Sequence, residues 1–305
     1  MNMNINEKAN ILNIRTAVTH DGVFHADDVT AWVLVTILNP DAVLVRSRKK
    51  ETFENADLVF DVGGEYFKYD HHKKNPEKRS NGIIYSSAGL LWRDFGALIV
   101  KHFAPELSEE EITLSVEKMD NDFFLTVCSE DNGQRLYSSE NRVITYSQVI
   151  SDLNPKDGSG DEEFQFAVEI GRRIFLKELN KVLSYVKEIS GLKRKIDEKE
   201  EPEILIMGDV ELNDSTLEAL CDIDKDVLYV VFKGRDSYRI MAMPVKYGEF
   251  TNRKPLPSEW RGKRDGEFEA ITGVKGAVFC HPGLFMAGAD SLEGAIALAK
   301  MAVRD

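Results

Sequence analysis

The residues best suited to chemistry in this chain are histidines and aspartates gathered in three short segments of its first half. They are His20, His25, Asp27, Asp28, Asp61, Asp70, His71 and His72. Mixed carboxylate and imidazole ligands suit manganese, magnesium or iron(II), and no cysteine lies among them to favour zinc. Two such ions held about 3.5–4 Å apart can clamp a phosphoryl group and generate a hydroxide nucleophile. The pattern therefore predicts a two-metal phosphoesterase site, with Asp61 as the carboxylate that bridges the ions.

Several of these residues also have simpler explanations when each is taken alone. His20 or Asp27 could cap the helix that follows it, and Asp61 could be a polar strand end. The segment YDHHKK is harder to explain in that way, because two adjacent histidines after an aspartate rarely occur by chance. Taken together, the residues favour a metal site.

The elements that must position these residues alternate between short apolar strands and longer helices. We expect strands at 14–19, 42–45, 58–60 and 66–69, and helices at 27–38 and 86–101. Such alternation predicts an α/β fold with a doubly wound, mostly parallel sheet. In sheets of this kind ligands bind beyond the carboxyl ends of the strands, which is where His20, Asp61 and Asp70 fall.

The second half of the chain has a different organisation. A loop-like segment at 154–163 precedes a long amphipathic helix at 164–195 and a charged linker at 193–203. A smaller unit follows, with strands expected at 204–207, 227–232, 238–243 and 277–280, and with 217–220 and 292–303 in helices. We therefore predict a metal-binding catalytic domain (1–160), a connecting helix and linker (161–200), and a smaller α/β substrate-binding domain (201–305).

Composition excludes several classes of protein. The net charge of −13 argues against a general polyanion-coating protein. Three widely spaced cysteines support neither a disulfide framework nor a zinc finger. The longest apolar run, at 31–38, is too short to span a bilayer, and residues 1–13 do not resemble a signal peptide. We expect a cytoplasmic protein without a membrane partner. Because P-loop, Rossmann and GxSxG motifs are missing from the sequence, the corresponding enzyme classes are disfavoured.

Three longer motifs are similar to those of a known family. HDGVFHADD, VFDVGGEYFKYDHH and WRGKRD…GVKGAVFCHPGLFMAG resemble the melanocyte-proliferating-gene family of DHH-type phosphoesterases, formerly catalogued as metal-dependent protein hydrolases. The resemblance covers roughly residues 15–120 and 130–300. It implies a DHH domain followed by a smaller substrate-binding domain, two manganese or magnesium ions, and 3′–5′ exonuclease activity on RNA.

The resemblance also implies roles for single residues. Matched position by position, it gives as metal ligands His20, His25, Asp27, Asp61, Asp70, His71 and Asp120. It implies that Asp61 bridges the metals and that His72 faces the phosphate, and we add Asp28 as a further catalytic candidate. The wider DHH superfamily begins its first motif with His-x-x-x-Asp-x-Asp, whereas this chain has His20 and then His25-Ala-Asp27. The VEKMD segment resembles the family's next acidic motif, which implies Asp120 as the remaining ligand. The Asp-Asn-Gly that normally follows comes only after an apparent insertion at 121–130, so Asp120, Asp122 and Asp131 stay open alternatives.

Candidate substrate-binding residues lie in both halves. Lys73 and Lys74, with Lys78 and Arg79, follow the histidine pair and would hold phosphate oxygens. In the second half, His281 and Gly283 resemble a loop that closes over substrate phosphates in relatives. Arg261 and Arg264 would add guanidinium groups, which bind phosphate in a bidentate way. The simpler alternative for the His281 segment is a turn in a mixed sheet.

These observations predict a metal-dependent phosphodiesterase that acts on RNA or short oligonucleotides. Three alternatives stay open: hydrolysis of a small phosphate compound such as pyrophosphate or a cyclic dinucleotide, amide hydrolysis, and a non-enzymatic module that binds RNA or a partner protein. The exposed side of the long helix offers a surface for a possible homodimer.

Overall fold

A computed structural model describes residues 11–156 and 160–305 and contains two compact units, the first ending at Leu183. A small parallel sheet forms the centre of this first unit. Its strands are β1 (Thr16–Thr19), β2 (Val43–Arg46) and β3 (Leu58–Val59), in the order β2-β1-β3. Both neighbours of β1 run parallel to it. The chain passes from β1 to one side and then to the other, so the strand order reverses at β1. Ligands of open α/β sheets bind at such a switch point.

Two helices pack beside this sheet. Helix α2 (Ala26–Leu38) joins β1 to β2 and packs against α4 (Ser87–Phe103). Every residue of α2 from Ala26 to Val35 is buried, as expected for a helix that carries apolar side chains all round. The short 3₁₀ helix η1 (Ile11–Asn13) and helix α3 (Lys50–Phe53) complete this part of the unit.

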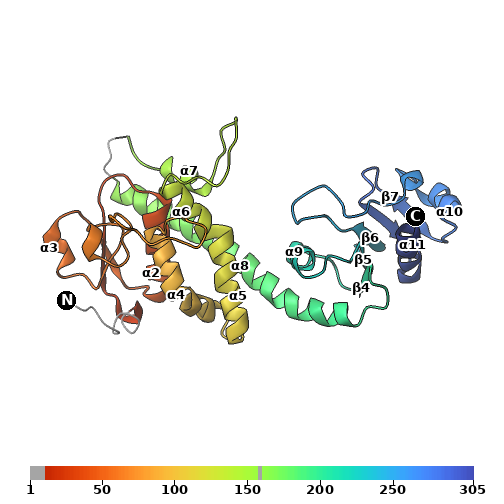
Figure 1. Cartoon of the computed structure of the whole chain (residues 1–305), viewed down its shortest axis with the longest axis horizontal. Coiled ribbons are helices and arrows are strands. Elements are labelled where there is room, and N and C mark those ends of the chain that lie inside the picture. The colour runs from red at the N-terminus through yellow and green to blue at the C-terminus, as the bar shows by residue number, and fades with distance from the viewer. Residues whose placement is uncertain (1–10, 157–159) are drawn as a thin grey trace. The chain divides into compact units, whose positions relative to one another are not determined.

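The predicted insertion at 121–130 is helical. Helix α5 (Glu109–Met119) continues through a π-helical turn, η3 (Asp120–Phe124), into α6 (Leu125–Asp131). The turn is anchored in the core, where the ring of Phe124 stacks on that of Trp92 at a centroid distance of 4.9 Å. An extended loop then leads to α7 (Tyr146–Ser151), as Figure 1 shows.

The prediction of a strand at 66–69 was wrong. Gly63 and Gly64 adopt positive φ angles of 95° and 69° and turn the chain into a 3₁₀ helix, η2 (Gly64–Tyr66). Only Tyr69 pairs with the sheet, through a parallel bridge to Phe60. Glycine tolerates this left-handed conformation because it has no Cβ atom.

The long helix predicted at 164–195 is confirmed as α8 (Asp161–Asp197). The chain divides into two compact units within this helix: the first ends at Leu183 and the second runs from Ser184 to Asp305. The finer division at 160 and 200 stays a prediction. Residues 157–159 of the predicted loop and residues 1–10 lie outside the described part of the chain.

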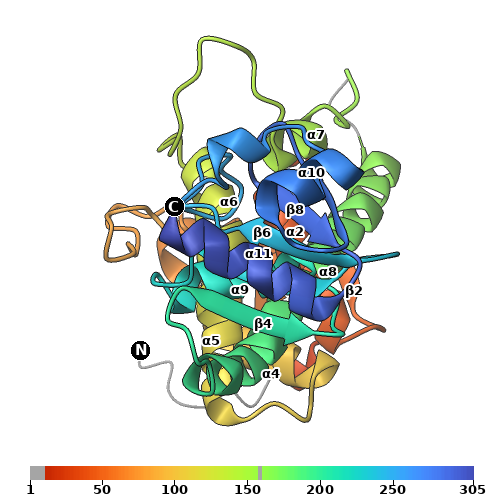
Figure 2. The ribbon, with the colours of Figure 1, turned by 90° about the vertical axis from the view of Figure 1, so that its right-hand side faces the viewer.

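The second unit contains a mixed sheet. Its strands are β4 (Ile204–Gly208), β5 (Tyr229–Lys233), β6 (Tyr238–Ala242), β7 (Ala277–Cys280) and β8 (Met286–Ala289). Their order is β4-β5-β6-β8-β7, with only the β4–β5 pair parallel among the described pairings. Helix α11 (Leu292–Arg304) lies across this sheet (Figure 2), and α9 (Asp214–Ile223), the 3₁₀ helix η4 (Ser258–Trp260) and α10 (Asp265–Thr272) complete the unit.

The predicted α/β fold is confirmed by both units. The sequence did not predict β8, because its residues Met-Ala-Gly-Ala lack the β-branched side chains that favour strands. Within residues 11–156 and 160–305, no helix combines the length and the apolar character needed to cross a membrane.

Candidate metal centre

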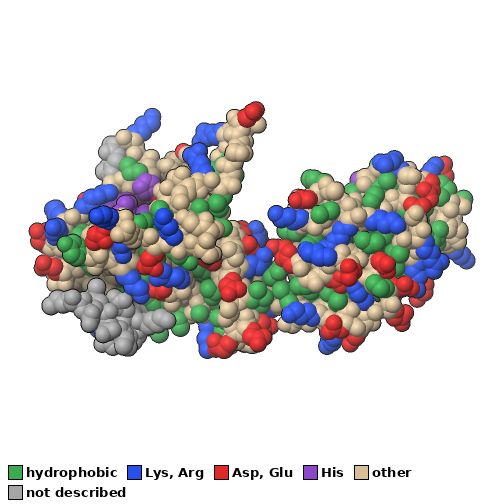
Figure 3. Space-filling view, in the orientation of Figure 1, with side chains coloured by type: hydrophobic (Ala, Val, Ile, Leu, Met, Phe, Trp, Pro, Cys, Tyr) green, Lys and Arg blue, Asp and Glu red, His purple; other side chains and the backbone are tan. Residues whose placement is uncertain are grey.

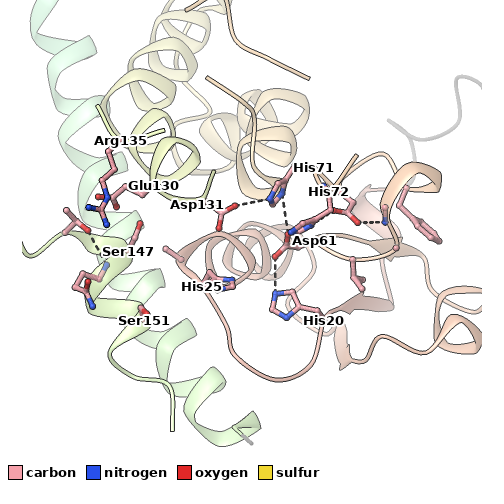
Figure 4. A pocket seen from close by; sticks show the side chains of 18 of the residues that line it. His20, His25, Asp61, His71, His72, Glu130, Asp131, Arg135, Ser147 and Ser151 are labelled. Carbon is pink, nitrogen blue, oxygen red and sulfur yellow. Dashed lines mark hydrogen bonds and ion pairs between the residues drawn. The ribbon is translucent and has the colours of Figure 1, made fainter. Parts of the chain in front are cut away.

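Two of the predicted site residues meet at the switch point of the first sheet. His20 directly follows β1, and Asp61 follows the β3 region. The Nε2 atom of His20 lies 3.2 Å from Oδ2 of Asp61 (Figure 4). The same atom lies 3.4 Å from Oδ2 of Asp28. Asp61 has a φ of +54°, a left-handed conformation that non-glycine residues adopt mainly where the surrounding structure imposes it. The backbone at this position is therefore held in a rare conformation.

The Asp-His-His segment approaches the same point. Asp70 accepts hydrogen bonds from the backbone N–H of Gly64 (2.5 Å), and from the backbone N–H (2.9 Å) and Nδ1 (2.8 Å) of His72. Burial alone would raise the pKa of Asp70, but these hydrogen bonds outweigh it and lower the pKa to about 2. The hydrogen bond to Asp70 raises the pKa of His72. The His72 side chain is 61% exposed and lies open to the pocket described below.

His71 links two carboxylates. Its Nε2 atom lies 3.0 Å from Oδ2 of Asp131, and its Nδ1 atom lies 3.4 Å from Oδ1 of Asp61. Ser87 Oγ donates to the same oxygen of Asp61 at 3.2 Å. Burial alone would lower the pKa of His71, but the bond to Asp131 and the nearby charges of Asp27 and Asp61 raise it to about 9.

Asp27 is held at the start of a helix. Its carboxylate accepts from the backbone N–H groups of Ser87 (3.0 Å) and Ala88 (2.7 Å), in the first turn of α4. Such N–H groups and the helix dipole favour a negative charge at this place. One Asp27 oxygen lies 3.9 Å from Nδ1 of His71, so the carboxylate also faces the cluster.

The cluster contains more buried carboxyl groups than its histidine side chains can neutralise. Burial raises the pKa of Asp27 and of Asp61, and raises that of Asp28 to about 8. The buried Oδ2 atom of Asp28 has no hydrogen-bond partner. Buried carboxylates in this state are costly unless a cation joins them. The residues present therefore fit divalent cations.

The possible ligand atoms fall into three groups, each with its atoms within 4.8 Å of one another. These groups are Asp61, Asp70, His71 and His72; His20, His25 and Asp28; and Asp27, His71 and Asp131. His71 is shared by two of the groups, and His20 of the third lies 3.2 Å from Asp61, so the three lie at one place. Oxygen and imidazole donors of this kind suit manganese or magnesium.

Of the three open alternatives, the structure brings Asp131 to the cluster, whereas Asp120, our first choice, lies elsewhere. Asp120 forms an ion pair with Arg79, and Asp122 pairs with Lys118 at 2.9 Å. The physical reason is that 120–131 is a helical stretch with Asp120 at its start and Asp131 at its end, where it reaches His71. Arg79 is buried, with its guanidinium 4.0 Å from the ring of Tyr85, so it does not flank the cluster as expected.

The cluster lies in a pocket of about 1600 Å³ that belongs wholly to the first unit. The predicted phosphate ligands Lys73 and Lys74 are not among its lining residues. Lys73 Nζ donates to the carbonyl of Lys68 (3.4 Å), and the backbone N–H of Lys74 donates to Glu65 (2.5 Å). The pocket instead has as its basic residues Arg48, Lys50, Arg135 and Arg142. Histidine side chains reach the surface among Lys and Arg side chains in this unit (Figure 3).

Two of these four basic residues belong to a feature that is visible in the sequence. Arg48 and Lys50 belong to the charged cluster at 46–50, which is most simply explained as a solvated loop. Because that cluster directly follows β2, its position at a strand end is the feature that could have indicated a site. Arg135 and Arg142 had no comparable signal.

The second unit gathers most of its own predicted residues at one turn after β7. Arg261 donates to the carbonyl of Pro282 (2.6 Å), and the N–H of Gly283 donates to Nδ1 of His281 (2.9 Å). Arg264 pairs with Phe279 through an isolated bridge. The roles of Arg261, Arg264, His281 and Gly283 as substrate ligands stay predictions.

The motifs that suggested a family are matched along nearly the whole chain. The sequence model of the MYG1 exonucleases, described as "Uncharacterised protein family (UPF0160)", matches residues 16–303. The chain belongs to this family. The MYG1 protein C27H6.8 of Caenorhabditis elegans is 30% identical over 324 residues, covering 93% of this chain and 94% of the relative. The MYG1 exonuclease of Homo sapiens is 28% identical over 315 residues, covering 92% of this chain and 84% of the relative. The predicted resemblance is confirmed.

Among solved structures, exonuclease RecJ bound to manganese aligns with 98% of this MYG1 family member and 94% of that chain, at 11% identity and a TM-score of 0.28.

Proposed function

We propose that this member of the MYG1 family is a divalent-metal-dependent phosphodiesterase that removes nucleotides from RNA or short oligonucleotides in the 3′–5′ direction. Family membership makes the chain a phosphoester hydrolase, since several of the relatives are named exonucleases. The RNA preference and the polarity are supported by the resemblance of the motifs. The observation that carries the proposal is the convergence of buried carboxylates and imidazoles in one open pocket.

Two manganese or magnesium ions would be held by members of the three groups of ligand atoms, two of which share His71, with Asp61 3.4 Å from its Nδ1 atom. Bound there, the ions would supply an activated water and would neutralise charge on the phosphoryl group. Asp131 orients His71 through the contact at its Nε2 atom, and Ser87 holds Asp61. Such hydrogen bonds keep metal-binding side chains in one geometry.

His72 has a separate task in this proposal. It is exposed in the pocket, and Asp70 holds a proton on it by accepting from its Nδ1 atom. A protonated imidazole beside the scissile phosphate would bind a non-bridging oxygen through a charge-assisted hydrogen bond. Asp28 is buried and does not line the pocket, and its Oδ2 atom lies 3.4 Å from Nε2 of His20. We therefore propose that Asp28 positions His20.

The size of the pocket favours an oligomer over a small phosphate compound. Sites for small molecules usually have volumes of about 300–1,000 Å³, whereas this pocket has about 1600 Å³. Pyrophosphate or a cyclic dinucleotide would leave much of it unfilled.

The test is hydrolysis of 5′-labelled single-stranded RNA and DNA in Mn²⁺, in Mg²⁺ and in EDTA, with pyrophosphate and a chromogenic amide in parallel. We expect a ladder of shortened RNA that requires metal and that is lost in Asp61→Asn. Asp41→Asn, an exposed aspartate outside the pocket, is the matched control. Hydrolysis of pyrophosphate or of the amide alone would overturn the exonuclease proposal, and so would RNA cleavage that survives both EDTA and Asp61→Asn.

A further inference from the structure

The pocket has two walls that play no part in holding the cations. One wall includes Arg48, Lys50, Phe53 and Tyr66, and the other is formed by the segment 133–145 together with α7. Each wall therefore carries both basic and aromatic side chains. Tyr66 is 82% exposed, so its ring is available to a ligand.

The segment from Gly133 to Thr145, called here the arm, contains no helix or strand. Figure 1 shows it extending away from the helices between α6 and α7. Loops of this length without secondary structure are usually functional when they belong to a compact unit. The arm starts two residues after Asp131, so it is attached directly to the cluster.

The side chains of the arm suit a strand of nucleic acid. Arg135, Tyr137 and Arg142 line the pocket. Arg142 pairs with Asp152 at 3.2 Å, but both side chains are more than half exposed. Exposed pairs of this kind contribute little, so the guanidinium can exchange its partner for a phosphate. The hydroxyl of Tyr137 donates to Glu130 (2.8 Å), which tethers a partly exposed ring at the edge of the pocket.

The charge around the cluster supports the same partner. Outside the candidate cation ligands, the charged lining residues are Arg48, Lys50, Arg135 and Arg142 against Glu54 and Glu130. Arg48 pairs with Asp21 at 2.6 Å, but both side chains are more than half exposed, so this pair too can give way to an anionic ligand. The positive excess among the lining residues occurs in a chain with a net charge of −13. Basic side chains would repel the cations that the cluster fits, so they are explained by an anionic ligand with several charges. Positive grooves with aromatic side chains are the usual means of binding single strands.

We propose that the arm is a single-strand-binding element of this enzyme. Arg135 and Arg142 bind phosphates, and the ring of Tyr137 stacks on a base, of an oligonucleotide whose scissile phosphate lies at the metal cluster. This inference rests on the proposed function and adds to it a preference for strands over dinucleotides. The preference for longer strands would thus come from the arm, which belongs to the first unit.

The test compares kcat/KM for a ten-nucleotide RNA with that for a dinucleotide of the same sequence. We expect Arg135→Gln/Arg142→Gln and Tyr137→Ala each to lower the ratio of the two values by about tenfold. Tyr137→Phe, which keeps the ring and loses the bond to Glu130, should retain most of the ratio. Arg173→Gln, an exposed arginine on α8 outside the pocket, is the matched control.

A ratio equal to that of the wild type in all arm variants would overturn the proposal, and so would an equal loss on both substrates. Binding of the labelled ten-nucleotide strand in EDTA, followed by fluorescence anisotropy, requires no catalysis. If the wild-type protein cleaves neither substrate, the proposed function fails, and weaker binding by the arm variants than by the control would still support the arm. Equal binding by all of them would reject it.

Discussion

Asn154 pairs with both backbone polar groups of Phe24, a residue 130 positions earlier in the chain. Its Oδ1 atom accepts from the N–H of Phe24 at 2.9 Å, and its Nδ2 group donates to the carbonyl at 2.7 Å. Phe24 directly precedes His25. Arg46 donates to the carbonyl of Gly22 in the same loop at 2.5 Å. The loop between His20 and His25 is thus held by side chains from distant parts of the first unit.

Asn154→Ala should therefore weaken manganese binding by about tenfold, a size typical of residues that orient metal ligands. The expected cause is a mobile His25, and calorimetric titration with Mn²⁺ measures it. Asn180→Ala, on the exposed side of α8, serves as the control. If both variants bind Mn²⁺ as the wild type does, the pair with Phe24 has no role in positioning the site.

Substitution of Asp131 and substitution of Asp120 should have different effects. Asp131→Asn removes the charged partner of His71, and we expect metal affinity and activity to fall by roughly 10–100-fold. Asp120→Asn breaks the ion pair with the buried Arg79, and we expect the free energy of unfolding to fall by about 1–3 kcal/mol. Metal affinity should stay near that of the wild type. Urea unfolding measures the stability of both variants, and titration with Mn²⁺ measures their metal affinity. Loss of metal binding in Asp120→Asn alone would refute the conclusion that Asp131, and not Asp120, belongs to the cluster.

The metal-free protein should become less stable as the pH rises from about 5.5 to 8. The pKa of Asp28 is raised from 3.8 to about 8 in the folded chain, so the folded state holds a proton that the unfolded state has lost. Stability then falls with pH across this interval. His71, with its pKa raised to about 9, contributes in the same direction from pH 6.5 upward. The lowered pKa of Asp70 acts only below about pH 4, outside this range.

We expect the melting temperature in EDTA to be lower at pH 8 than at pH 5.5 by roughly 5 °C. Mn²⁺ should stabilise the protein more at pH 8, because the ligands must be deprotonated to bind it. Asp28→Asn should flatten the pH dependence in EDTA. Stability in EDTA that rises toward pH 8 would show that these carboxylates are ionised without metal.

Gly63→Ala should destabilise the first unit and the site. A Cβ atom there would overlap the Phe67 ring, and the φ of +95° is itself unfavourable for alanine. Gly82→Ala, with a φ of +85° and nothing within 4 Å, separates the two causes. We expect about 1 kcal/mol for the control and about 1–3 kcal/mol more for Gly63→Ala. Equal losses in urea unfolding would show that the contact with Phe67 relaxes freely.

Local patterns in the sequence predicted which residues of the cluster lie together, and their roles stay predictions. His20 and Asp61 could be assigned because each follows a short apolar run, and strand ends meet at one edge of a parallel sheet. Asp70, His71 and His72 stand in one uninterrupted motif. Asp131 could not be chosen over Asp120, since the choice depends on whether residues 121–130 form a loop or a helix. The partners Asn154 and Phe24 carry no local signal for their pairing.

For the fold, too, local sequence patterns were predictive, whereas features that depend on distant residues were not. Helix α8 was predicted from its apolar spacing, which is a local property. The strand expected at 66–69 failed because two glycines before it decide the path of the chain. Arg135 and Arg142 could not be predicted to line the pocket, because that depends on the position of the arm beside the cluster. Composition carries no information about this position.

The π-helical turn at Asp120–Phe124 holds one residue more than an α-helical turn would, so a deletion there can be absorbed by a return to a regular α-helix. Helix α6 has no such spare residue, and a deletion within it would rotate every later residue by about 100° around the axis. Asp131 would then point away from His71, although no residue of the site had changed. Chain length should thus be far more constrained between Leu125 and Asp131 than in the arm that follows, where added residues need not move any member of the cluster.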